Sequence, residues 1–216
     1  VGSEMCIRDR ISRFRFNSMM ALPGRYIYIR DNDTADYWSA SWQPVGKPLD
    51  KYKSECRHGT AYTVISSEYE NIAAETAYYV PNGKTYEVWR SKITNNDSKP
   101  RKLSVFGFVE FTNDNNYEQD QVNLQYSQYI TKTVFRGNRV RQMIHANLDR
   151  LDEGEKVDNK DVTNRFLGLA GVPVDSWCGE KEAFLGRYHG YGNPVGVIDG
   201  KLNCEGNYNE NSCGAL

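Results

Sequence analysis

The sequence predicts an all-β fold of antiparallel strands, and three features of the 216-residue chain support this. Short segments whose side chains alternate between two faces recur along most of the chain, as is typical of strands. Turn sequences rich in Gly, Pro, Asn and Asp separate these segments. Apolar residues nowhere recur at helical spacing over a dozen positions. Because strand follows strand in this way, we expect a sandwich of antiparallel sheets.

The individual elements follow from this alternation and from the turns between them. Residues 72–80 and 86–94 flank the turn at residues 81–83 and are predicted to form a hairpin. Residues 165–174 are apolar enough for a buried strand, residues 148–163 are charged and indicate a surface excursion, and the glycines of residues 182–200 indicate close turns. The other expected strands are residues 13–16, 25–30, 37–44, 51–66, 105–111, 129–135 and 140–145.

The composition of the chain argues against several classes of function. With 39% hydrophobic residues and a net charge of −1, the chain is expected to form one domain with a sizeable core. It lacks the basic excess of a nucleic-acid-binding protein, and no apolar stretch approaches the roughly 18 residues of a membrane span. The five cysteines form no CxxC pair and are odd in number, which indicates reduced thiols, a cytoplasmic location and no metal site.

The two ends of the chain differ from the rest. Residues 1–10, VGSEMCIRDR, lack an initial Met and resemble translated adapter DNA, so we exclude them from the expected domain, residues 11–216. Residues 213–216 end without a cap or a turn. We therefore expect a sandwich that is incomplete at both ends.

A polar segment directly follows the expected strand at residues 105–111. Residues 112–125 are mostly amides and carboxylates, with Tyr117 as the one aromatic residue. Such side chains suit sugars, because amides pair with hydroxyls and an aromatic ring packs on the apolar face of a pyranose. A solvated surface loop has the same composition, so the residues alone leave both interpretations open.

Two other places have the composition of a site. Trp38 and Trp42 fall on one face of the strand at residues 37–44, where they indicate either a core or a platform for sugars. His58 follows Arg57 and precedes Gly59. Because no Ser or Cys nucleophile lies at a recognisable elbow, a hydrogen-bonded structural His is the favoured interpretation over a catalytic one.

Long stretches of the chain resemble the N-terminal domain of the inverting disaccharide phosphorylases of glycoside hydrolase family 94, which includes cellobiose, cellodextrin and diacetylchitobiose phosphorylases. The stretches cover nearly all of residues 12–216 in order. They are RFRFNSMMALPGRYIYIRDN, DYWSASWQPVGKPLD, ECRHGTAYT, FGFVEFTNDNNYEQDQVNLQ and NYNENSCGAL.

The resemblance implies an antiparallel β-supersandwich of the galactose-mutarotase-like kind, followed in an intact enzyme by a helical linker and an (α/α) barrel. It implies a glycosyltransferase reaction in which inorganic phosphate attacks the anomeric carbon of a β-linked gluco-oligosaccharide with inversion, while a carboxylic acid protonates the leaving oxygen. Phosphate is the co-substrate and no cofactor is implied. The acid belongs to the barrel, so we expect no catalytic residue in this chain. Glu110 lies on a strand face with two Phe residues, and we expect it to pair structurally or at the edge of the cleft.

The resemblance also implies a homodimer in which a loop of this domain reaches the neighbouring active site. The family pattern falls on Asp120, Asn123 and Gln125, and Asn115 lies near a position that faces the acceptor sugar. Tyr126 stands where cellobiose-type members have Arg, which puts plain cellobiose specificity in doubt. Two alternatives remain open: a stand-alone carbohydrate-binding β-sandwich without catalysis, and a purely structural module.

Overall fold

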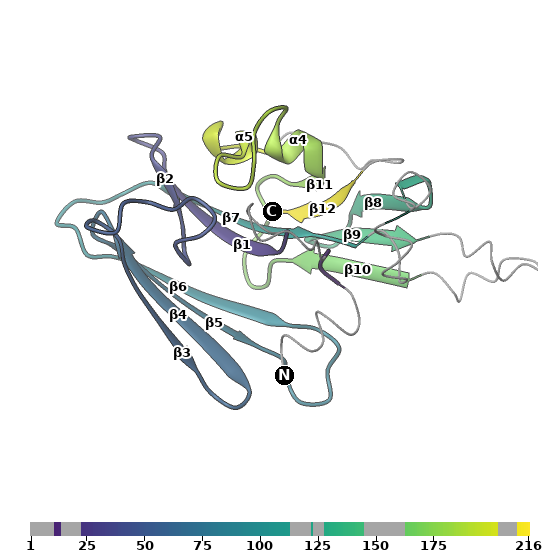
Figure 1. Ribbon diagram of the computed structural model, residues 1–216, viewed down its shortest axis with the longest axis horizontal. Helices are drawn as coiled ribbons and strands as arrows, with labels where there is room; N and C mark the ends of the chain where they lie inside the picture. Colours follow the sequence, from purple (N-terminus) through teal and green to yellow (C-terminus); the bar gives the residue numbers. More distant parts are fainter. Residues whose placement is uncertain (1–10, 14–22, 113–121, 123–127, 145–162, 203–210) are drawn as a thin grey trace, which may run out of the picture.

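The computed structural model describes residues 11–13, 23–112, 122, 128–144, 163–202 and 211–216 (Figure 1). In these residues the prediction of an all-β chain is confirmed, because strands dominate and the two helices are short. The elements are β1 (Arg25–Asp31), β2 (Tyr37–Ser39), β3 (Lys53–His58), β4 (Tyr62–Tyr69), β5 (Ile72–Tyr79), β6 (Val88–Asn95), β7 (Leu103–Glu110), β8 (Thr131–Phe135), β9 (Arg139–Ile144), β10 (Thr163–Gly168), β11 (Cys178–Glu180), α4 (Lys181–Leu185), α5 (Val195–Ile198) and β12 (Ser212–Ala215).

The strands form three antiparallel sheets. A five-stranded sheet has the order β11-β12-β7-β1-β2, a three-stranded sheet has the order β10-β9-β8, and a four-stranded sheet has the order β3-β4-β5-β6. The four-stranded sheet is a meander of hairpins, and its β5-β6 hairpin is the one predicted from the sequence. In Figure 1 this sheet diverges from the other two.

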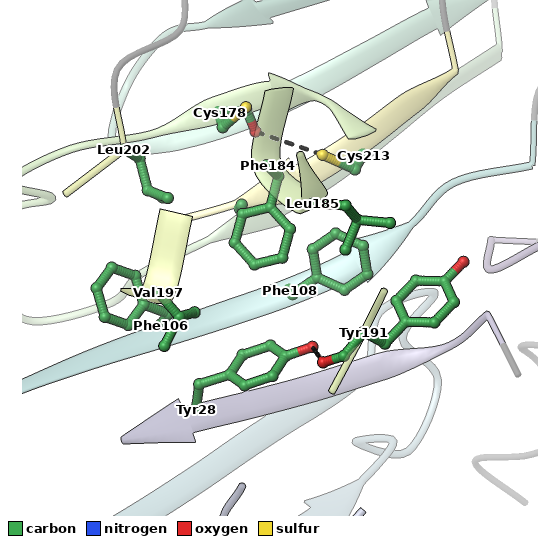
Figure 2. Packing of buried hydrophobic residues seen from close by; sticks show 11 residues of the cluster. Tyr28, Phe106, Phe108, Cys178, Phe184, Leu185, Tyr191, Val197, Leu202 and Cys213 are labelled. Atoms are coloured by element: carbon green, nitrogen blue, oxygen red, sulfur yellow. Dashed lines mark hydrogen bonds between the residues drawn. The ribbon is translucent and has the colours of Figure 1, made fainter. Parts of the chain in front are cut away.

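The first core lies between the five-stranded sheet and the two helices. Tyr28 of β1 pairs in register with Phe106 of β7, so both side chains point to the same face of the sheet. Phe108 lies on that face too, and its ring stacks on Phe184 of α4 at 4.6 Å between centroids. Figure 2 shows these rings packed together with Leu185, Val197, Leu202 and the two sulfurs of Cys178 and Cys213.

The second core lies where the four-stranded sheet meets the opposite face of β1. Ile27 and Ile29 point to this face and pack with Trp38, Tyr69 and Ile72. Trp38 is 1% exposed and its ring lies 5.2 Å from that of Tyr69. The apolar alternation of β1 therefore serves two cores, one on each face of the sheet.

Several expectations from the sequence are wrong, and one of them is the strand expected at residues 37–44, which ends at Ser39. The strand expected at residues 165–174 ends at Gly168, and Phe166 within it is 48% exposed. Residues 182–200, expected to form only close turns, contain most of α4 and all of α5. Cys178 is disulfide-bonded, whereas Cys56 and Cys213 have the free thiols that the sequence predicts.

Candidate functional site

The five residues predicted to contact the acceptor sugar, Asn115, Asp120, Asn123, Gln125 and Tyr126, lie outside the described residues. The structure does describe the chain on both sides of them, from β7 through Thr112 and from Gln128 onward. The candidate site is therefore built from the residues that hold the two ends of segment 113–127. These residues form two buried polar clusters, one around Glu110 and one around Thr112.

The first cluster surrounds the Glu110 side chain, which is fully buried at the end of β7. Its Oε1 atom lies 3.3 Å from Nζ of Lys181 and 3.6 Å from an NH1 atom of Arg13. Its Oε2 atom accepts a hydrogen bond from the hydroxyl of Tyr191. Arg13 also donates to Oδ1 of Asn211 at 2.9 Å. Because a buried carboxylate is tolerated only when it is paired, Glu110 has the structural role that was expected for it.

Burial, assisted by the charge of Glu110, raises the pKa of two neighbouring side chains, Tyr26 and Cys213. Burial raises the pKa of Tyr26 to about 12, and the charge of Glu110 adds to this effect. Burial also raises the pKa of the Cys213 thiol well above its usual value; Glu110 acts in the same direction, while Lys181 opposes it. The thiolate is the nucleophilic form of Cys, so Cys213 is inert at neutral pH. The contacts of the cluster are those of a buried, paired carboxylate that holds structure.

The second cluster surrounds the backbone of Thr112, the last described residue before segment 113–127. Its N–H donates to the carbonyl of Ile11 at 3.1 Å. Its carbonyl accepts from Nε2 of Gln142 at 2.9 Å and lies 3.5 Å from NH1 of Arg165. Nε2 of Gln142 also donates to Oγ of Ser212 at 2.6 Å. Residue 11 and side chains from β9 and β10 therefore converge on the backbone of Thr112, and β12 supports the Gln142 side chain.

A groove of ≈1650 Å³ opens on the side of β7 that faces away from the helices. One wall is β6, with Trp89 and Ile93, and the other is β7, with Val105 and Gly107; Phe166 of β10 also lines it. Val105 is 46% exposed. In Figure 1 the four-stranded sheet diverges from β7 and β10, whose residues line the groove together with those of β6.

Neither of the other two predicted places forms a site. Trp38 is buried in the second core, and Trp42 packs against the same core and donates from its indole nitrogen to the carbonyl of Lys47 at 2.7 Å. The core interpretation of this face is confirmed. His58 is exposed; its Nδ1 atom lies 3.0 Å from the hydroxyl oxygen of Thr63 and its Nε2 atom lies 3.4 Å from Sγ of Cys56, so it is hydrogen-bonded as expected of a structural His.

Within the described ranges, no three or more His, Cys, Asp or Glu residues are grouped so that they could hold a metal ion. The absence of a cofactor stays a prediction. Among the same residues, the structure has no helix that is long and apolar enough to cross a membrane.

Known proteins resemble this chain over nearly its whole length. The family model described as "Glycosyl hydrolase 94, supersandwich domain" matches residues 4–216. The chain belongs to this family. The resemblance predicted from the quoted stretches is thus confirmed, and so is the supersandwich fold that it implied.

Several members of the family are phosphorylases. The chain is 35% identical over 208 residues to the N,N'-diacetylchitobiose phosphorylase of Vibrio furnissii. The matched residues cover 96% of this chain and 24% of that protein. It is 29% identical over 196 residues to the solabiose phosphorylase of Paenibacillus borealis, 89% of this chain and 22% of that protein. The cellobionic acid phosphorylase of Neurospora crassa is 26% identical over 181 residues, with 83% and 21% covered. The chain thus spans about a quarter of the length of these relatives.

Sequence reasoning missed the residues that hold segment 113–127 in this glycosyl hydrolase 94 domain. Gln142 and Arg165 lie on β9 and β10, both predicted as strands, but their side chains were not predicted to be buried. One signal was present. Each is a long polar residue in an apolar alternating strand, which indicates either a solvent-facing side chain or a buried one with partners.

Proposed function

We propose that the chain is the N-terminal part of a phosphorylase that cleaves a β-linked gluco-disaccharide or oligosaccharide with inorganic phosphate. The observation that carries the proposal is the family match over residues 4–216, together with relatives that are phosphorylases. The buried backbone of Thr112, the residue that precedes segment 113–127, supports a binding role for that segment, because positioning side chains against a sugar requires a rigid support.

The proposed reaction is an inverting phosphorolysis. An oxygen of inorganic phosphate attacks the anomeric carbon on the face opposite the leaving sugar, the glycosidic C–O bond breaks, and a carboxylic acid gives its proton to the leaving oxygen. The products are a sugar 1-phosphate and the shortened acceptor. We place the acid and the phosphate-binding groups outside these 216 residues, so the chain by itself is expected to be inactive.

The proposed contribution of this domain is to bind the acceptor sugar and to form dimer contacts. Asn115, Asp120, Asn123 and Gln125 supply the amide and carboxylate groups that pair with sugar hydroxyls. Tyr126 offers a ring where cellobiose-type members have Arg, which favours an acceptor other than glucose. In a homodimer, these side chains would act in the active site of the neighbouring subunit.

We also propose that the enzyme needs no cofactor and works in the cytoplasm. The free thiols of Cys56 and Cys213 are consistent with that compartment, whereas the disulfide at Cys178 speaks against it.

Phosphate release by the full-length protein that carries this domain tests the proposal. The protein receives glucose 1-phosphate or N-acetylglucosamine 1-phosphate as the donor, and glucose, cellobiose or N-acetylglucosamine as the acceptor. We expect release that depends on one donor and one acceptor, with N-acetylglucosamine tried first because of the two diacetylchitobiose phosphorylases at 35% identity. The 216-residue chain alone is the negative control.

A folded full-length protein that releases no phosphate with any pair would overturn the proposal. The alternative is then a carbohydrate-binding β-sandwich without catalysis. Titration of the same sugars by calorimetry separates this alternative from a structural module, because only a binding module gives saturable heat.

A further inference from the structure

The groove between β6 and β7 exposes a large apolar surface. Val105, Phe166, Leu169 and Val172 line it, and each of them is between 45% and 56% exposed. An exposed apolar patch of this kind marks a place where another surface binds. The groove volume of ≈1650 Å³ is larger than the roughly 300–1,000 Å³ of a small-molecule pocket. A segment of polypeptide therefore suits the groove better than a sugar does.

Two strands that line this groove have unpaired backbone edges. β6 is the last strand in the order β3-β4-β5-β6, so one of its edges has no neighbour among the described strands. On the β12 side of β7, the register ends with Ala215 opposite Phe108, and Leu216 bonds to Gly107 one residue further. In the part of the chain that the structure describes, the first half of β7 is therefore paired with β1 alone. Open edges such as these accept an additional strand.

The backbone of Val105 shows where such a strand would run. The N–H and the carbonyl of Gly107 are both bonded to Leu216, at 3.0 Å each. In an antiparallel strand, residues two positions apart direct their backbone groups to the same side. The N–H and the carbonyl of Val105 therefore point to the line that β12 would follow beyond Leu216. No strand that the structure describes lies on that line.

The side chains of β12 already alternate between the first core and the groove. Cys213 and Ala215 belong to the first core, whereas Leu216 lines the groove. If the strand continued with the same alternation, the second residue after Leu216 would lie opposite Val105 and on the same face. An apolar side chain at that position would cover Val105.

We propose that the polypeptide that follows Leu216 in the full-length protein extends β12 along β7 and fills this groove. The inference takes from the proposed function only that the chain is the N-terminal part of a longer protein. The matched residues are 24% of the Vibrio furnissii protein, so a long polypeptide remains to supply the strand. A direct continuation of β12 closes no loop and associates no second molecule, so its entropic cost is smaller than that of any other occupant.

The first measurement is disulfide formation in the full-length protein. Val105→Cys is combined with a cysteine substituted at the second position after Leu216. Residues that lie opposite each other in antiparallel strands have Cα atoms about 4.5–5.5 Å apart, which is within the range of a disulfide. In the matched control, the second cysteine is placed one position earlier, where its side chain would point to the first core. Peptide mass spectrometry after mild oxidation identifies the crosslink, and we expect it within one molecule and in the first pair only.

The second measurement needs no crosslink and follows the reaction of one introduced thiol with iodoacetamide. Val105→Cys and Phe166→Cys are compared with Tyr188→Cys, which replaces a side chain that is 104% exposed. The rate in the native full-length protein is compared with the rate of the same variant in urea. We expect the two groove thiols to react at least about ten-fold more slowly in the native protein than in urea, because a covered thiol reacts only when the structure opens. The two rates of Tyr188→Cys are expected to be nearly equal.

The crosslink together with slow labelling of the groove thiols supports the inference. The absence of a crosslink in the first pair, an equal crosslink in the control pair, or fast labelling of both groove thiols overturns it. Slow labelling without the crosslink would mean that a different segment or a second copy covers the groove, which also overturns it. Phosphate release is measured separately, so an inactive protein that forms the crosslink overturns the phosphorylase proposal alone.

Discussion

The two faces of β7 have similar sequences but differ in how far their side chains are buried. On one face, Phe106, Phe108 and Glu110 are all buried, beneath α4, α5 and Tyr191. On the other face, Val109 is buried but Val105 is 46% exposed and lines the groove. Because both faces are apolar by sequence, the strand itself does not decide which of them forms a core. The elements packed over each face decide it.

The largest loss of stability is expected on the face of β7 that the helices cover, at Glu110. Glu110→Ala leaves the buried cations of Arg13 and Lys181 without their carboxylate, so we expect a loss of about 3–5 kcal/mol in the free energy of unfolding. Urea unfolding measures it. Glu110→Gln is the control, since it keeps the volume and an acceptor for Tyr191 and is expected to cost less. A loss below about 1 kcal/mol for the Ala variant would contradict a buried ion pair.

A comparable loss is expected in the apolar part of the same face. Phe108→Ala removes a fully buried ring that stacks on Phe184, and a cavity of this kind typically costs about 3–5 kcal/mol. Denaturant unfolding at neutral pH gives the value. Phe108→Leu retains most of the apolar contact and serves as the control. A near-neutral Phe108→Ala would show that the helices do not cover this face in solution.

Two strands of this sheet, β1 and β7, could be predicted from the sequence because alternation is a local property. Residues 25–30 and 105–111 alternate in type, and β1 and β7 form there with only small differences at their ends. What covers each face depends on segments far away in the chain, such as α4, whose five residues are too few for a helical period to show.

The site could be predicted only in part, because its contacts also join segments that are far apart in the chain. The sequence directed attention to residues 112–125, because their composition is unusual. The residues that hold this segment, Gln142 and Arg165, are separated from Thr112 by 30 and 53 positions. Their partnership depends on the register of β9 and β10, which no local pattern reveals. The five predicted sugar contacts remain predictions.

A smaller effect is expected at the opposite end of the β1-β7 pair, where Asp31 lies across from Leu103. Burial acts to raise the pKa of Asp31, but bonds from Arg101 and from the N–H groups of Asp33 and Thr34 outweigh it, so the pKa is lowered. The carboxylate therefore stabilises the fold above its unfolded pKa of about 3.9, and this contribution is lost as the pH falls through the folded value.

Asp31→Asn tests this end of the pair. The variant is expected to be less stable at neutral pH and to lose less stability than the wild type when the pH is lowered from about 5 to about 3. Thermal unfolding across that range measures both effects. Asp33→Asn is the control, because Asp33 takes part through its backbone N–H alone at 2.8 Å. An unchanged acid response in Asp31→Asn would remove Asp31 from the acid stability of the protein.

The smallest loss of stability is expected on the face of β7 that lines the groove. Val105→Ala removes two carbon atoms from a side chain that is 46% exposed, so the loss is expected to stay within about 0.5 kcal/mol in the 216-residue chain. The same substitution in the full-length protein decides whether the groove is open there too. If the loss there rises to the roughly 1–2 kcal/mol of a buried aliphatic truncation, another part of the protein covers Val105. A loss equal to that of Phe108→Ala in the short chain would instead break the comparison, because both faces of β7 would then be core.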